Sequence, residues 1–122
     1  MSGEILSSIS LEYAKGGDDA SWNHGPQSID VSGSNQSKGT LDLTTSWEAI
    51  PLGDIATVGV IAVKNIGSTN NAEIRGSLTG DPWIVLKPGE EWSFRMSPTG
   101  FTAPAARAAA STTRLKFLLI ED

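Results

Sequence analysis

The chain has 122 residues, 39% of them hydrophobic, and a formal net charge of −5 at pH 7. Its nine Lys and Arg residues are scattered, which disfavours direct nucleic-acid binding because neutralising phosphates requires clustered cations. The chain has no cysteine, which excludes disulfides, thiolate nucleophiles and Cys-ligated zinc. Its apolar runs are far too short to span a membrane, so no membrane association is expected.

The length of the chain predicts a single domain over 1–122. A chain of this size buries roughly two-thirds of its unfolded surface, so it can hold a core without disulfides or metals. The N-terminal residues, from Met1 to Leu6, contain neither a basic region nor an apolar stretch of signal-peptide length. We therefore expect no secretory signal, and synthesis and folding in the cytoplasm.

An alternation of apolar and polar side chains begins close to the N-terminus. Ile5, Ile9 and Leu11 fall on one parity, and Glu4 falls on the other. A period of two is typical of a strand with one buried face and one solvated face. We predict the first strand over 4–14.

The residues after this strand are predicted to form an extended loop region over 15–39. It contains a short strand at 28–31 and a polar turn or loop at 32–39. Trp22 and His24 lie in the loop region, and we predict that both contact another chain. Trp22 is the tryptophan that we expect to be exposed.

The middle of the chain is predicted to contain three strands. The first covers 40–49. The second, at 58–66, is apolar on both parities, which indicates a strand that is covered on both faces or central in its sheet. Gly and Asn residues at 67–71 predict a hairpin turn into the third strand at 72–78.

The remaining strands are predicted at 83–87, 90–97 and 113–121, with a Pro-Gly turn between the first two. The alanine-rich segment 103–110 is predicted as a short strand or loop, because so short a helix is marginal in water. About eight strands with turn signals between them make an all-β protein, an antiparallel β-sandwich or jelly roll. The pattern does not distinguish a sandwich from a closed barrel.

The last strand carries apolar side chains on both of its faces. Leu115, Phe117 and Leu119 share one face, and Leu118 and Ile120 share the other. Exposed apolar patches usually mark a contact with a partner. Leu118 and Ile120 are therefore predicted interface residues, together with Trp22 and His24.

No catalytic or metal-binding constellation is predicted. His24 lies near Asp18 and Asp19, but a flexible loop does not hold the geometry of a charge relay, and the closing Glu of a calcium loop is absent. Glu90 and Glu91 point to opposite faces of a strand, which disfavours two-carboxylate glycosidase chemistry. We therefore predict that the chain is not an enzyme and has no catalytic residue, metal or cofactor.

The four tryptophans raise carbohydrate binding as an alternative function. Trp47 and Trp92 fall on inward parities, and Trp83 lies in a strand that is apolar on both sides. These three are predicted core residues. Trp22 alone offers little aromatic surface on which a sugar can stack, which disfavours this alternative.

Residues 52–122 resemble small β-rich proteins from the structural gene clusters of tailed bacteriophages. The shared pattern begins with the segment at 52–65, which ends in Lys-Asn, and continues with a polar hairpin. It goes on through a Leu-x-Pro-Gly-Glu turn and an Arg-bearing strand to an alanine-rich stretch and an acidic end. The corresponding residues here are 68–71, 86–90, Arg95, 105–110 and 118–122.

This resemblance implies a non-enzymatic virion structural protein, most readily a capsid decoration or cement protein that binds the outer head shell. The major capsid protein or other virion proteins would then be its partners. The resemblance also implies a small homo-oligomer, for which a trimer is one of the alternatives. A minor tail, neck or fibre component is the alternative in the same setting. The expected location is the virion, after synthesis in the host cytoplasm.

Overall fold

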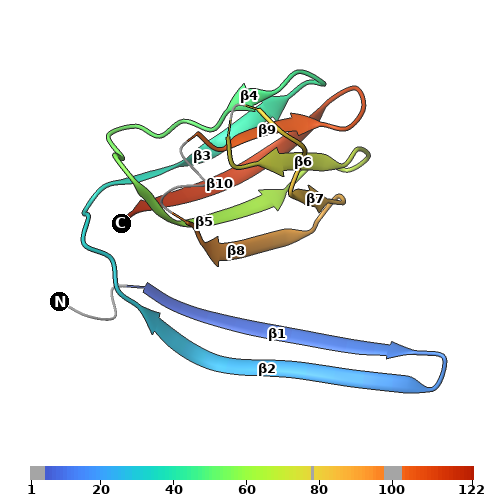
Figure 1. Ribbon diagram of the computed structural model, residues 1–122. Helices are drawn as coiled ribbons and strands as arrows, with labels where there is room; N and C mark the ends of the chain where they lie inside the picture. Colours follow the sequence, from blue (N-terminus) through green and yellow to red (C-terminus); the bar gives the residue numbers. More distant parts are fainter. Residues whose placement is uncertain (1–4, 78, 98–102) are drawn as a thin grey trace. The chain divides into compact units, whose positions relative to one another are not determined.

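The computed structural model describes residues 5–77, 79–97 and 103–122 of the chain. Within these residues there are ten strands in three antiparallel sheets and no helix (Figure 1). The prediction of an all-β, sandwich-like fold is therefore confirmed. The chain divides into two compact units, Met1–Ser32 and Gly33–Asp122, and each is described by itself.

The first unit is a long antiparallel hairpin of β1 (Ile5–Lys15) and β2 (Asp18–Ile29) (Figure 1). Gly16 and Gly17 form its turn with φ angles of 61° and 87°, a backbone region that glycine enters without the steric cost of a Cβ. None of the described side chains in residues 5–32 is buried. The hairpin therefore has no core of its own.

The structure places a strand over most of the segment that the sequence predicted as a loop, since β2 covers 18–29 and β3 begins at Gln36. The expected short strand at 28–31 is the end of β2. Pro26 and the polar residues around it suggested a loop, but an edge strand tolerates proline. The single-domain prediction stays a prediction, because the division into units does not show whether either folds alone.

The second unit is a sandwich of two four-stranded sheets (Figure 1). The first sheet has the order β3 (Gln36–Leu43), β10 (Thr113–Glu121), β5 (Val58–Asn65) and β8 (Glu91–Arg95). The second has the order β4 (Glu48–Ala49), β9 (Ala105–Ala108), β6 (Ala72–Arg75) and β7 (Ile84–Leu86). The strand predicted at 58–66 is central, as expected, because β5 lies between β10 and β8.

The core lies between these two sheets. Large side chains of the first sheet pack with mostly smaller side chains of the second in one apolar cluster. Each fully buried aliphatic side chain contributes about 2 kcal/mol through its removal from water. The members from the strands are Leu43, Val58, Ile61, Val63, Leu115, Phe117 and Leu119 in the first sheet and Ala72, Ile74, Leu86, Ala106 and Ala108 in the second.

The predicted hairpin at 67–71 is wrong, because the chain passes there from one sheet to the other, as it also does at the predicted Pro-Gly turn. β5 and β6 belong to different sheets, and so do β7 and β8. The predicted strand at 40–49 is likewise divided between β3 and β4 in opposite sheets. Turn residues predict where the chain reverses, but they carry no information about which sheet the next strand joins.

The crossing from β5 to β6 is fixed by the buried side chain of Asn65. Its Nδ2 donates to the carbonyl oxygens of Asn70 and Leu86, both at 2.9 Å. Its Oδ1 accepts from the backbone N–H of Gly67 at 3.0 Å and from the Thr113 hydroxyl at 2.8 Å. The amide thus uses its full hydrogen-bonding capacity, and it ties the loop after β5 to both β7 and β10.

Candidate functional site

The exposed large apolar side chains gather mainly in two patches. Among the described residues such side chains are Leu6, Leu11, Tyr13, Trp22, Ile66, Trp83, Val85 and Trp92. Three of them share one face of the hairpin, and three line a groove in the sandwich. Single exposed apolar residues are ordinary, but clusters mark binding surfaces. The two patches are therefore the candidate sites.

The first patch, here named the arm face, consists of Leu11, Tyr13, Trp22 and Ala20. Leu11 lies opposite Trp22 in the hairpin register, and Tyr13 lies opposite Ala20. Directly opposite residues of antiparallel strands point to the same side, so these four form one surface. The exposed fractions are 49% for Leu11, 56% for Tyr13 and 60% for Trp22.

The other face of the hairpin is polar at the same level. Ser10 lies opposite Asn23, and Glu12 lies opposite Ser21. The Ser10 hydroxyl donates to the Asn23 Oδ1 at 2.7 Å. The hairpin is therefore amphipathic, although it has no core to cover its apolar face. A two-stranded hairpin is marginally stable by itself in water, so covering the arm face stabilises it.

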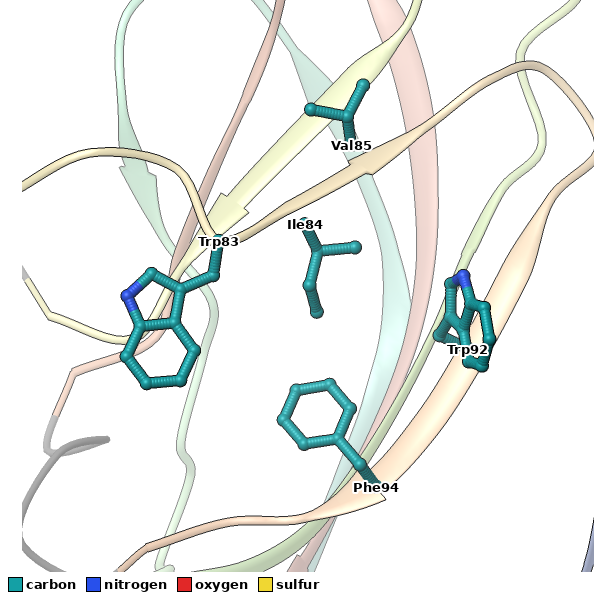
Figure 2. A pocket seen from close by; sticks show the side chains of 5 residues that line it. All are labelled: Trp83, Ile84, Val85, Trp92 and Phe94. Atoms are coloured by element: carbon teal, nitrogen blue, oxygen red, sulfur yellow. The ribbon is translucent and has the colours of Figure 1, made fainter.

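The second patch, here named the groove, lies where the last strands of the two sheets meet. β8 ends the first sheet and β7 ends the second in the described part of the chain. Five side chains line an open hollow of about 470 Å³, with Trp83 and Trp92 on either side of Ile84 and Phe94 (Figure 2). The lining residues are Trp83, Ile84, Val85, Trp92 and Phe94.

The side chains that line the groove range from mostly exposed to half-buried. Trp83, Val85 and Trp92 are 68%, 50% and 48% exposed. Ile84 and Phe94 are half-buried and pack against the core cluster. The groove therefore has a fixed floor and two exposed aromatic walls, which is a shape that takes an apolar partner.

The turn between β7 and β8 holds the two sides of the groove together. The Glu90 N–H donates to the Lys87 carbonyl at 3.0 Å, and the Lys87 N–H donates to the Glu90 Oε1 at 2.8 Å. The Gly89 N–H, at a φ of 89°, donates to the Asn65 carbonyl at 2.8 Å. Because Asn65 also binds the Leu86 carbonyl, one buried residue positions both strands.

The predicted burial of three tryptophans is corrected by the structure. Trp92 has the predicted parity with Phe94 and buried Met96, but it lies on an edge strand and is half exposed. Trp83 precedes β7 and is mostly exposed. Alternation gives the direction of a side chain, but it does not tell whether another strand covers it. The predicted exposure of Trp22 is confirmed.

Trp47 is half-buried and lies outside the buried core. The guanidinium carbons of Arg75 and Arg107 lie 4.0 Å and 4.5 Å from its ring centroid. The Arg107 Nε also donates to the Glu73 Oε1 at 2.7 Å. Cation–π contacts and this ion pair account for the position of Trp47. They stabilise the second sheet.

Of the four predicted interface residues, Trp22 lies on the arm face. Leu118 and Ile120 are half-buried on the outward side of β10, in the second unit. The backbone of His24 pairs with Ile9 in the hairpin, but its side chain lies outside the described residues. The interface role of these four stays a prediction, and the sequence missed the groove altogether.

The Glu121 carboxylate holds two loops of the sandwich. Its oxygens accept from the backbone N–H groups of Ala56 at 2.8 Å, Ser34 at 3.2 Å and Asn35 at 3.3 Å, and from the Asn35 Nδ2 at 3.1 Å. The bond from Ala56, reinforced by those from Asn35 and Ser34, lowers the pKa of Glu121 below its usual value against the opposing effect of burial. Its role is structural, because the partners are loop backbone and a neighbouring amide.

Within the described residues, no group of three or more His, Asp or Glu side chains is arranged to hold a metal ion. No helix in the part of the chain that the structure describes is long and apolar enough to cross a membrane.

No protein-family model and no curated protein matches this chain. One similar solved structure comes from work reporting that Bacillus endospore appendages form a novel family of disulfide-linked pili. The two chains are 20% identical, the match covers 79% of this chain and 98% of the other, and the TM-score is 0.39. A TM-score this low supports no functional argument. The present chain has no cysteine for a disulfide linkage.

Proposed function

We propose that this protein is a non-enzymatic structural subunit that assembles with other protein chains. The observation that carries the proposal is the arm face, in which Leu11, Tyr13 and Trp22 are each about half exposed on a hairpin without a core. An apolar surface of this kind is stabilised when a partner removes it from water.

The finer form of the proposal is a virion structural protein, namely a capsid decoration or cement protein on the outer head shell. The phage resemblance of residues 52–122 supports it, and so does the pairing of a β scaffold with an apolar contact surface. The major capsid protein or another virion protein is the proposed partner. A minor tail, neck or fibre component has the same support from the chain, and the two differ in copy number.

Binding to undecorated heads tests the proposal. We expect stoichiometric binding by the wild-type protein and a loss of more than about tenfold in affinity for Tyr13→Ser/Trp22→Ser, because buried aromatic side chains dominate such contacts. Ser10→Ala/Ser21→Ala changes the opposite face of the hairpin and is the matched control, which retains binding.

Failure to bind heads, together with absence from purified particles, would contradict the virion assignment. Electron microscopy of labelled particles separates its two versions. Many copies over the shell indicate a decoration protein, and a few copies at one vertex indicate a tail or neck component.

Carbohydrate binding is a second candidate function, and the groove is the observation that favours it. Trp83 and Trp92 present two exposed rings on either side of an apolar floor (Figure 2). Aromatic walls of this kind stack on the apolar faces of sugars. A glycan that binds there changes tryptophan fluorescence in the wild type and not in Trp92→Ala. A flat titration across glycans would dispose of this candidate.

A further inference from the structure

We propose that the groove binds the arm face of a second copy of this chain, so that copies join head to tail. The inference rests on the proposed function and names one partner of the assembling subunit. The donor surface is Leu11, Tyr13 and Trp22 on the hairpin. The acceptor surface is the groove between Trp83 and Trp92.

The distribution of apolar surface favours two unlike contacts over one self-complementary contact. Among the described residues, six of the eight exposed large apolar side chains fall into the two patches, three in each. A contact between identical patches needs one patch only, whereas unlike patches meet either head to tail or reciprocally in a closed two-fold pair. One patch on each unit of the same chain provides the donor and the acceptor that a heterologous contact needs, and such contacts extend into rings or filaments.

The local structures of the two patches also match. The groove lies where the edge strands β7 and β8 meet, and edge strands accept an added strand. The hairpin supplies two strands whose outer edges have no further strand beside them in the described residues. β2 has 12 residues, so it spans about 40 Å at about 3.4 Å per residue.

The area involved is sufficient for a specific contact. An aromatic side chain that is half exposed has about 100 Å² left to bury. Tyr13, Trp22, Trp83 and Trp92 therefore supply about 400 Å², and the half-exposed Leu11 and Val85 bring the apolar area to roughly 550 Å². Because about 56–58% of a specific interface is apolar, this area corresponds to a total of about 1,000 Å². Trp83 and Trp92 in the groove and Tyr13 and Trp22 on the arm face belong to the residue types that dominate the free energy of binding.

The absence of cysteine from the chain allows a direct test by disulfide cross-linking. Ala20→Cys places a thiol on the arm face, and Val85→Cys places one at the groove. Each variant carries one thiol, so a cross-link between the two in a mixture is necessarily between molecules. Ser21→Cys, next to Ala20 but on the opposite face of the hairpin, is the matched control.

We expect the mixture of Ala20→Cys and Val85→Cys to form a heterodimeric disulfide much faster than the mixture of Ser21→Cys and Val85→Cys. Trp92→Ala in the groove partner should weaken the association by about 30-fold, as expected for a central aromatic side chain. Circular dichroism and thermal unfolding of the Trp92→Ala variant verify that it is folded.

Three outcomes would overturn this inference. Equal rates with Ser21→Cys mean that the arm face does not meet the groove. Faster formation of the Ala20→Cys homodimer means that arms contact arms, and the proposed assembly function then survives without the groove. A protein that binds heads through the arm face but remains monomeric in solution likewise retains the proposed function and refutes the second copy as the occupant.

Discussion

At the residue scale, Glu121 makes the stability of the sandwich dependent on pH. Its pKa is lowered in the folded chain from the usual 4.5, so folding favours the ionised form. The stability that it contributes is fully present above the unfolded pKa and is lost as the pH falls through the lowered folded pKa. We therefore expect the melting temperature of the wild type to fall on acidification through the range below about pH 5.

Glu121→Gln removes this titration and places an amide donor against the N–H groups of Ala56 and Ser34. The variant should melt below the wild type at pH 7, with a shallower dependence on acid pH. Differential scanning calorimetry at several pH values measures both effects. Glu48→Gln, an exposed residue of β4, is the charge-matched control. Parallel pH profiles for Glu121→Gln and the wild type would contradict the role assigned to the carboxylate.

Asn65 has the largest predicted effect of a single side chain. Replacing it with Leu leaves the carbonyls of Asn70 and Leu86 and the N–H of Gly67 without their partner, and each such group costs about 1–3 kcal/mol when buried. We expect Asn65→Leu to lower the free energy of unfolding by at least about 3 kcal/mol in urea titration. Thr113→Ser keeps the hydroxyl that donates to Asn65 and should cost far less.

The same substitution also bears on the groove, because the side-chain amide of Asn65 donates to the carbonyl of Leu86 in β7. A change in the fluorescence of Trp83 and Trp92 should accompany the loss of stability. If Asn65→Leu unfolds at the wild-type urea concentration, the amide is not the link between the sheets.

At the element scale, the hairpin and the sandwich are predicted to be separable. All buried core residues belong to the second unit, and none of the described side chains in 5–32 is buried. The fragment 33–122 should therefore fold cooperatively, with a melting temperature within a few degrees of that of the full chain. An unfolded fragment would show that the hairpin completes the sandwich and that 1–122 is one domain.

The elements themselves were largely predictable, because alternation is a local property of the chain. The last strand was predicted over 113–121, which are the bounds of β10. The alanine-rich segment, which was predicted as a short strand or loop, contains the short strand β9. Strand partners were not predictable, since the turns after β5 and β7 cross between sheets. That choice depends on long-range packing and on the Asn65 hydrogen bonds.

At the scale of the whole molecule, the candidate sites depend on which strands lie at an edge. Trp92 has the same alternation as buried strand residues, and its exposure follows from the position of β8 at the end of its sheet. The arm face was not predicted, because the sequence pattern indicated a loop around Trp22. Its pairing with Leu11 in the hairpin is the fact that makes an isolated tryptophan part of a surface.

The last prediction concerns the size of the assembly and uses two variants that each lack one patch. Tyr13→Ser/Trp22→Ser retains the groove, and Trp83→Ser/Trp92→Ser retains the arm face. In a head-to-tail assembly neither variant associates with itself, because each contact needs one patch of each kind. Their mixture has one intact donor and one intact acceptor per pair.

Sedimentation velocity at equal concentrations therefore separates three species. We expect monomers for each variant alone, heterodimers that grow no further for the mixture, and larger species for the wild type at the same total concentration. Because the contact is apolar, its strength should change little between low and high salt. Self-association of Trp83→Ser/Trp92→Ser, which lacks the groove, to the wild-type extent would instead mean that the arm faces contact each other. The assembly would then close as a two-fold dimer.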